Sequence, residues 1–202
     1  KSINYKDDSR ILNIFKNIHY VSADRIGPRL FVDKFGIGSL ERTDSRGENS
    51  INILSSNKEK LNEKLFIGDI VPSNLTELCQ MWLSYIFDGA NIKINSDGES
   101  VLALNLSSKD DGSLYKSVNV GFGYSYILSI VITCLLAKDN DIVIFENPEA
   151  HLHPKAQSRL THLFTRLSLS NVQLFIESHS EHILNGLRVG VANKSCAITE
   201  KS

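Results

Sequence analysis

Two short stretches of this 202-residue sequence concentrate carboxylates and histidines. ENPEAHLHP, residues 146–154, follows a run of branched and aromatic residues, and ESHSEH, residues 177–182, follows a second apolar run. A carboxylate directly after a buried strand needs a cation or a hydrogen-bonding partner, because burying an unpaired charge is costly. Both stretches are therefore candidates for metal binding or acid–base chemistry.

A third stretch, VGFGYSYIL at residues 120–128, precedes both. Gly121 and Gly123 would let the backbone approach a ligand closely at the start of a helix. Each stretch alone also has a purely structural explanation: glycines suit a tight turn, histidines suit a solvated loop, and Ser178 followed by Glu181 is a helix N-cap pattern. It is their combination that indicates a binding site.

The elements around these stretches alternate in type. We expect helices at 125–138, 154–168 and 179–188, and strands at 142–145, 172–176 and near 196–199. This order predicts an α/β fold with a mainly parallel sheet and covering helices, in which ligands gather at the carboxyl ends of the strands.

The first part of the chain is expected to be a smaller helical and β-rich region. We predict a helix at 10–18, an extended segment after it, an irregular loop or insertion at 35–62, an amphipathic helix at 75–86, and a β-meander at 91–95, 100–106 and 114–120. Asn74 with Glu77 is a capping box for the amphipathic helix. We divide the chain into 1–118, partly an insertion or lobe, and a core segment at 119–202.

Bulk composition excludes little but favours an ordinary soluble domain. With 22 basic and 23 acidic residues, the charge gives no support for nucleic acid or an anionic membrane as a partner, although a local basic patch is compatible with it. The apolar stretch 126–137 is too short to span a bilayer. Cys79, Cys134 and Cys196 lie far apart, which predicts reduced core thiols and a cytoplasmic location.

The order of motifs resembles the C-terminal half of an ABC-type ATPase head of the kind found in RecF, SMC and OLD-like proteins, and in bacterial AAA-type ATPases. VGFGYSYIL is similar to the signature loop, IVIFENPEAHLHP to the Walker B strand with the D-loop, and FIESHSEHIL to the switch-histidine segment. YVSADRIGPR, residues 20–29, also resembles a segment of these proteins. The resemblance is strong over about 120–188 and thin elsewhere.

The resemblance implies a P-loop NTPase fold, ATP and Mg²⁺ as ligands, and a head-to-tail homodimer with a nucleotide between its subunits. Glu146 matches the Walker B acid that holds Mg²⁺, and His179 matches the switch histidine at the γ-phosphate. The residues that match the signature loop, which would meet the nucleotide of the opposite subunit, are Gly121, Phe122, Gly123 and Ser125.

Two departures from the family pattern qualify these expectations. Asn147 stands where many such heads have the catalytic Glu, and an amide orients water without accepting its proton, so Glu149 is an alternative base. The pattern G-x-x-x-x-G-K-[ST] does not occur in the 202 residues. The resemblance therefore implies that the lobe carrying the phosphate loop lies outside them.

Two rival functions stay open from the sequence. His151, His153, His179 and His182 with the two glutamates could bind zinc or manganese in a hydrolase or nuclease, although no standard zinc signature is met. The other rival is an ATPase-like module that assembles with a partner without hydrolysing ATP. Asn147 is the residue that favours this function.

Overall fold

A computed structural model of the chain describes residues 17–29, 32–33, 42–56, 60–96, 101–107, 115–116 and 122–193. The predicted helix at 10–18 falls outside these ranges except for its end, where Ile18 instead begins a strand. The predicted strand near 196–199 also lies outside them. In the described ranges, no helix is long and apolar enough to cross a membrane.

A three-stranded parallel sheet forms the centre of the fold, in the order β1 (Ile18–Val21), β6 (Ile142–Glu146) and β7 (Gln173–Glu177). The predicted α/β class with a mainly parallel sheet is confirmed. The register aligns Val21 with Phe145, and Glu146 with Glu177. Because β1 pairs with β6, the sheet crosses the division at residue 118 drawn from the sequence, and that division stays a prediction.

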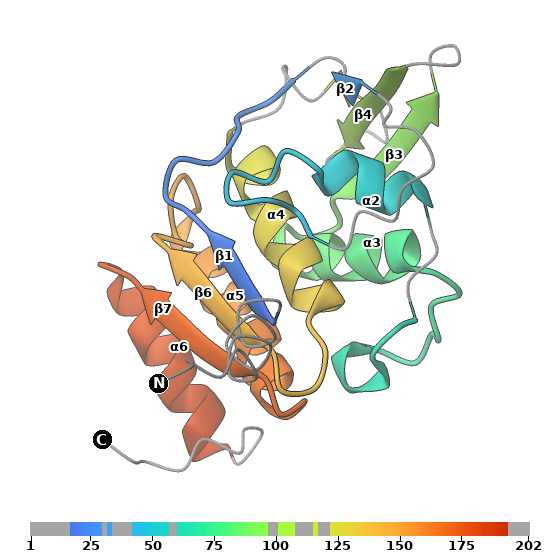
Figure 1. The fold of residues 1–202 in the computed structure, drawn as a ribbon. Coiled ribbons are helices and arrows are strands. Elements are labelled where there is room, and N and C mark those ends of the chain that lie inside the picture. Colours follow the sequence, from blue (N-terminus) through green and yellow to red (C-terminus); the bar gives the residue numbers. More distant parts are fainter. Residues whose placement is uncertain are drawn as a thin grey trace, which may run out of the picture.

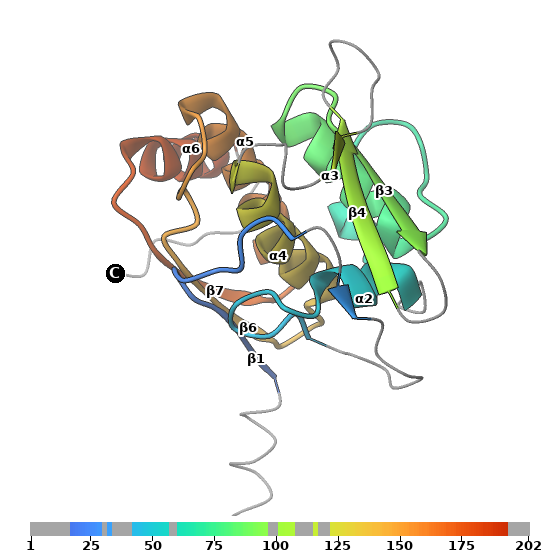
Figure 2. The ribbon, with the colours of Figure 1, turned by 90° about the horizontal axis from the view of Figure 1, so that it is seen from above.

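Three helices pack on one face of this sheet: α4 (Phe122–Leu136), α5 (Pro154–Ser168) and α6 (Glu181–Ala192) (Figure 2). Strand alternation directs Val143 and Phe145 into the core beneath them, where both are fully buried. On the other face, Tyr20 and Phe175 flank Ile144 in register and remain 41% and 49% exposed. The sheet therefore buries its helix-covered face much more completely.

The amphipathic helix α3 (Leu75–Ile86) packs against α4 and α5. Its apolar positions recur at helical spacing, and every one of them is buried, including Trp82. Asn74 is the N-cap and accepts a hydrogen bond from Glu77 N at 2.9 Å, as the capping pattern predicts. The Glu77 carboxylate accepts in return from Ser73 N at 2.7 Å.

An antiparallel sheet lies beside this core (Figure 1). It contains β2 (Val32–Asp33), β3 (Asn91–Ser96), β4 (Val101–Ser107) and β5 (Tyr115–Lys116), with β4 central, which confirms the predicted meander in outline. The prediction of an irregular loop at 35–62 was wrong in part, because α2 (Ser50–Ser56) lies within it. Burial of Ile53 and Leu54 stabilises this short helix despite its Ser and Asn content. A 3₁₀ turn, η1 (Glu63–Leu65), follows it.

Helices α5 and α6 approach each other closely because two glycines face two threonines. A Cβ on Gly186 would lie 2.2 Å from Thr161 Oγ1, and one on Gly190 would lie 2.4 Å from Thr165 Cγ2. Both threonines are buried. This contact fixes α6, and with it the loop that joins β7 to α6.

Gly186→Ala is therefore expected to lower the free energy of unfolding by about 1–2 kcal/mol, because overpacking outweighs the gain in helix propensity. Urea denaturation of the single variants and of Gly186→Ala with Thr161→Ala measures the coupling. The double variant should recover part of the loss, since the clashing atoms are gone. Strictly additive losses would contradict this account of the contact.

Candidate functional site

The carboxyl ends of β6 and β7 bring the predicted site residues to one edge of the sheet. Glu146 is in register with Glu177, and Asn147 N continues the pairing by donating to Glu177 O at 2.9 Å. The loops that carry Glu149 and His179 therefore leave the sheet side by side. Parallel α/β sheets bind their ligands at edges of this kind.

The Glu146 carboxylate is held by the chain that follows β1. Its Oε2 accepts a hydrogen bond from Ala23 N at 3.1 Å. The nearby Glu146 carboxylate raises the pKa of Tyr20, chiefly as a hydrogen-bond acceptor for its hydroxyl, with smaller contributions from burial and from the carboxylate charge. The carboxylate at the strand end is thus oriented by the segment after β1, more than a hundred residues away in the sequence.

Arg25 is a buried cation beneath the same strand end, and sequence reasoning missed its part in the site. Its Nη1 donates to Ser22 O at 2.9 Å and Glu146 O at 2.8 Å, and its Nη2 donates to Asn147 O at 2.7 Å. The residue is only 2% exposed, and burial lowers its pKa. The segment 20–29 resembles a segment of the family, but the resemblance did not indicate what Arg25 contacts. Its acceptors are backbone carbonyls, which every residue has, so no sequence pattern marks them.

Asn147 adopts an uncommon backbone conformation. Its φ is +43°, in a region that Asn tolerates better than most residues, and it precedes Pro148. Its side-chain Oδ1 is buried and has no hydrogen-bond partner in the structure. A buried acceptor without a partner is rare and marks a place where a water or ligand can donate.

Glu149 links the two loops. Its Oε2 accepts from Ser178 Oγ at 2.9 Å, and its Oε1 accepts from His179 N at 2.7 Å. The N-cap prediction for Ser178 was wrong, because α6 begins at Glu181 and Ser180 caps it. The side chain of Ser178 is instead directed to Glu149, a tertiary contact that the local pattern did not reveal.

The histidines near this edge have separate environments. His179 is 82% exposed, and its Nε2 lies 3.1 Å from Glu177 Oε1. His151 packs edge-on against Tyr126, and His153 is the N-cap of α5. Across the described ranges, no three His, Cys, Asp or Glu side chains lie close enough to hold one metal ion. The zinc or manganese site considered from the sequence is therefore not assembled by these histidines and glutamates.

The stretch predicted as a glycine loop is mostly helical, because α4 begins at Phe122. Gly121 lies outside the described residues, as does the side chain of Phe122. Gly123 is needed for packing, since a Cβ there would lie 2.6 Å from His151 O. Ser125 Oγ is buried without a hydrogen-bond partner, and the residue lines a cavity of about 40 Å³. This volume suffices for a water molecule.

We expect Glu149→Ala to lower the free energy of unfolding by about 1–2 kcal/mol, because the Ser178 hydroxyl and His179 N–H lose a charged acceptor. Glu149→Gln should lose less, since its amide oxygen can still accept. Urea denaturation at neutral pH measures both. Glu181→Ala, an exposed glutamate in the first turn of α6, is the control and should stay below about 1 kcal/mol.

Comparison with solved structures finds SMC head domains. An Smc head domain with an extended coiled coil, bound to the C-terminal domain of ScpA, from Pyrococcus furiosus is 10% identical, with a TM-score of 0.44 over 54% of this chain and 28% of that one. A structure from work on ATP-driven dimerization and DNA-stimulated activation of SMC ATPases is 11% identical, with a TM-score of 0.47 over 54% of this chain and 68% of that one.

Comparison of the sequence with protein-family models identifies the family of the chain. The chain matches no curated protein sequence. The family model described as AAA ATPase domain matches residues 3–184, which include β1, both loops of the site and most of the covering helices. The chain therefore belongs to the AAA ATPase domain family.

Proposed function

We propose that this chain supplies the magnesium and water side of an ATP-hydrolysing site, within an assembly in which two heads enclose the nucleotide head to tail. The observation that carries the proposal is that Glu146, Asn147 and His179 lie at one sheet edge, with the Glu146 carboxylate already oriented by Ala23 N–H. Membership of the AAA ATPase domain family supports ATP as the nucleotide.

Glu146 fits the part of a magnesium ligand. In phosphoryl-transfer sites Mg²⁺ keeps several waters and takes only one or two carboxylates, so a site with a single strand-end glutamate suits it better than a dedicated cage. When bound, the ion would neutralise charge on the phosphate groups. Glu146 would hold it directly or through water, while Ala23 N–H keeps one carboxylate oxygen in place.

Two side chains are candidates for orienting the attacking water. Asn147 Oδ1 is buried and lacks a partner, so it can accept from a water but cannot remove its proton. Glu149 accepts from Ser178 and His179, yet a carboxylate has about four acceptor positions and retains room for a water proton. Glu149 is therefore our candidate for the base, and Asn147 for the positioning of the water.

His179 and the start of α4 are proposed to contact the γ-phosphate from two different subunits. The imidazole of His179 is 82% exposed and so is accessible to a nucleotide bound at this edge. The first turn of α4, with Phe122, Gly123 and Ser125, would offer its amides to the nucleotide of the opposite subunit, with Gly121 preceding it. Two such contacts would couple ATP binding to dimer formation.

The test is ATP hydrolysis by the full-length protein. Glu146→Gln should reduce Mg²⁺-dependent turnover by about a hundredfold or more, because charge stabilisation of the transferred phosphoryl group is lost while the side-chain shape is kept. Glu181→Gln removes a nearby exposed carboxylate as a matched control and should leave the rate unchanged. Equal turnover in the parent and Glu146→Gln would contradict the proposal.

Glu149→Gln distinguishes a base from a structural link. If Glu149 removes the water proton, this variant should lose turnover by a hundredfold or more, on the order expected for general-base catalysis, yet still dimerise with ATP in size-exclusion chromatography. A Glu149→Gln protein as fast as the parent would leave the residue with only its link to the β7 loop. In that case water positioning would fall to Asn147 alone.

A further inference from the structure

We infer that Arg25 is the positioning residue of this site, which holds the backbone of Glu146 and Asn147 in the conformation that the site needs. The inference rests on the proposed function for its catalytic consequence, but its structural part stands on contacts alone. Arg25 donates to the consecutive carbonyls of Glu146 and Asn147 with its two Nη atoms, at 2.8 and 2.7 Å.

These two contacts fix the two torsion angles of one residue. The carbonyl of Glu146 belongs to the peptide plane before the Asn147 Cα, and the carbonyl of Asn147 belongs to the plane after it. Holding both carbonyls therefore sets φ and ψ of Asn147. The Asn147 N–H, which donates to Glu177 O at 2.9 Å, gives a third constraint on the same residue.

Asn147 needs such constraints because its conformation is unfavourable by itself. Its φ of +43° is sparsely populated, and the following Pro148 restricts it further. Strained residues persist where their surroundings over-determine them. The side chain of this residue carries the unpartnered Oδ1, so the strained backbone determines where that acceptor lies.

The chemistry of the contact requires arginine. A planar guanidinium presents donors in a rigid fork that reaches two adjacent oxygens at once, whereas a lysine ammonium is a compact point charge. Arg25 is 2% exposed, and the three acceptors of its hydrogen bonds in the described part of the chain are all backbone carbonyls; the third is Ser22 O in its own turn, at 2.9 Å. The guanidinium therefore orients backbone carbonyls by hydrogen bonds rather than forming an ion pair.

Arg25 also contacts the helix proposed to meet the opposite nucleotide. Its guanidinium carbon lies 5.3 Å from the centroid of the Tyr126 ring, in the first half of α4. The ring face of tyrosine attracts a cation. One side chain thus ties the turn after β1 to the end of β6 and to α4.

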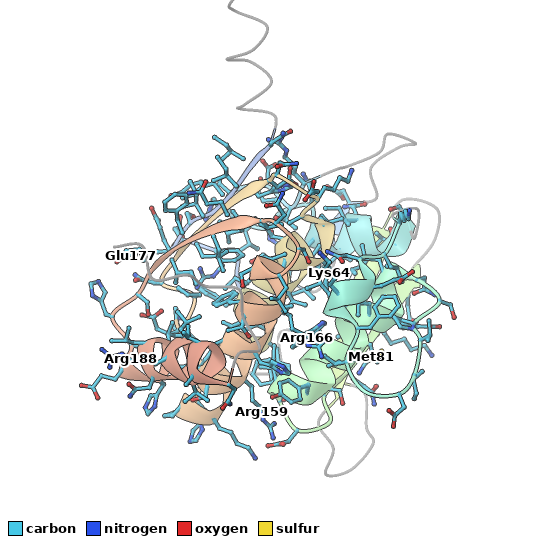
Figure 3. All side chains as sticks on the ribbon, turned by 90° about the horizontal axis from the view of Figure 1, so that it is seen from below. Lys64, Met81, Arg159, Arg166, Glu177 and Arg188 are labelled. Atoms are coloured by element: carbon cyan, nitrogen blue, oxygen red, sulfur yellow. The ribbon has the colours of Figure 1, made fainter. Side chains whose placement is uncertain are left out.

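The experiment compares Arg25→Lys with Arg166→Lys in the full-length protein. Arg166 is a matched control, because it is a partly buried arginine that donates to two backbone carbonyls, those of Lys64 and Phe66. Figure 3 shows it beside Lys64 and well apart from Glu177 at the end of β7. Thermal unfolding of both variants establishes that each is folded before any other measurement.

Two readouts are expected to change only in Arg25→Lys. Hydrogen exchange at the amides of Asn147, Ala150 and Leu152 should become at least about tenfold faster, because the loop loses its anchor, while exchange in the middle of β6 stays as in the parent. The turnover number should fall by about tenfold to a hundredfold with KM for ATP within about twofold, since a misplaced group slows the chemical step more than binding.

Each outcome decides one question. Parent-like exchange at 147–152 in Arg25→Lys would overturn the positioning role, as would faster exchange spread evenly over the whole sheet, which indicates general destabilisation. A parent protein without ATPase activity would contradict the proposed function instead, and the exchange data would still decide for or against Arg25. Faster local exchange with unchanged turnover would remove the catalytic consequence.

Discussion

The parallel pairing of β6 with β7 is the constraint on which the site depends. Its register places Glu146 opposite Glu177, and the pairing continues one residue further through Asn147 N–H. A slip of one residue would turn Val143 and Phe145 out of the core and carry the whole loop after β6 out of line with the loop after β7. The burial of these two side chains beneath the helices therefore fixes the site as firmly as it fixes the sheet.

The elements that could be predicted from the sequence are those that bury one face. α3 and α5 have apolar residues at helical spacing and clear N-terminal signals, Asn74 and Pro154, and both begin where expected. The carboxylates of Glu146 and Glu177, at the ends of β6 and β7, could be predicted as neighbours for a similar reason, since each ends an apolar run. These signals come from residues that are close in the sequence, so the sequence alone reveals them.

The features that the sequence did not reveal depend on tertiary contacts. α2 has only seven residues, and burial against the rest of the molecule stabilises it more than its own pattern does. The local pattern pointed to Ser178 as the N-cap, but the Ser178 hydroxyl donates to Glu149 and Ser180 caps α6, a difference that depends on the tertiary position of Glu149. Arg25 is the clearest case, because its partners are carbonyls, and every residue has one.

The segment after β1 also contributes to the site, so the ends of three strands, rather than two, position its residues. Ala23 and Arg25 in this segment hydrogen-bond to the side chain and the backbone of Glu146, although they precede it by more than a hundred residues. The two glutamates are consequently held in different ways: Glu146 by this segment, and Glu149 by the loop after β7. A change in the loop after β7 would therefore alter the contacts of the Glu149 carboxylate and leave the Ala23 contact of the Glu146 carboxylate intact. The candidate metal ligand and the candidate base therefore depend on different parts of the chain for their orientation.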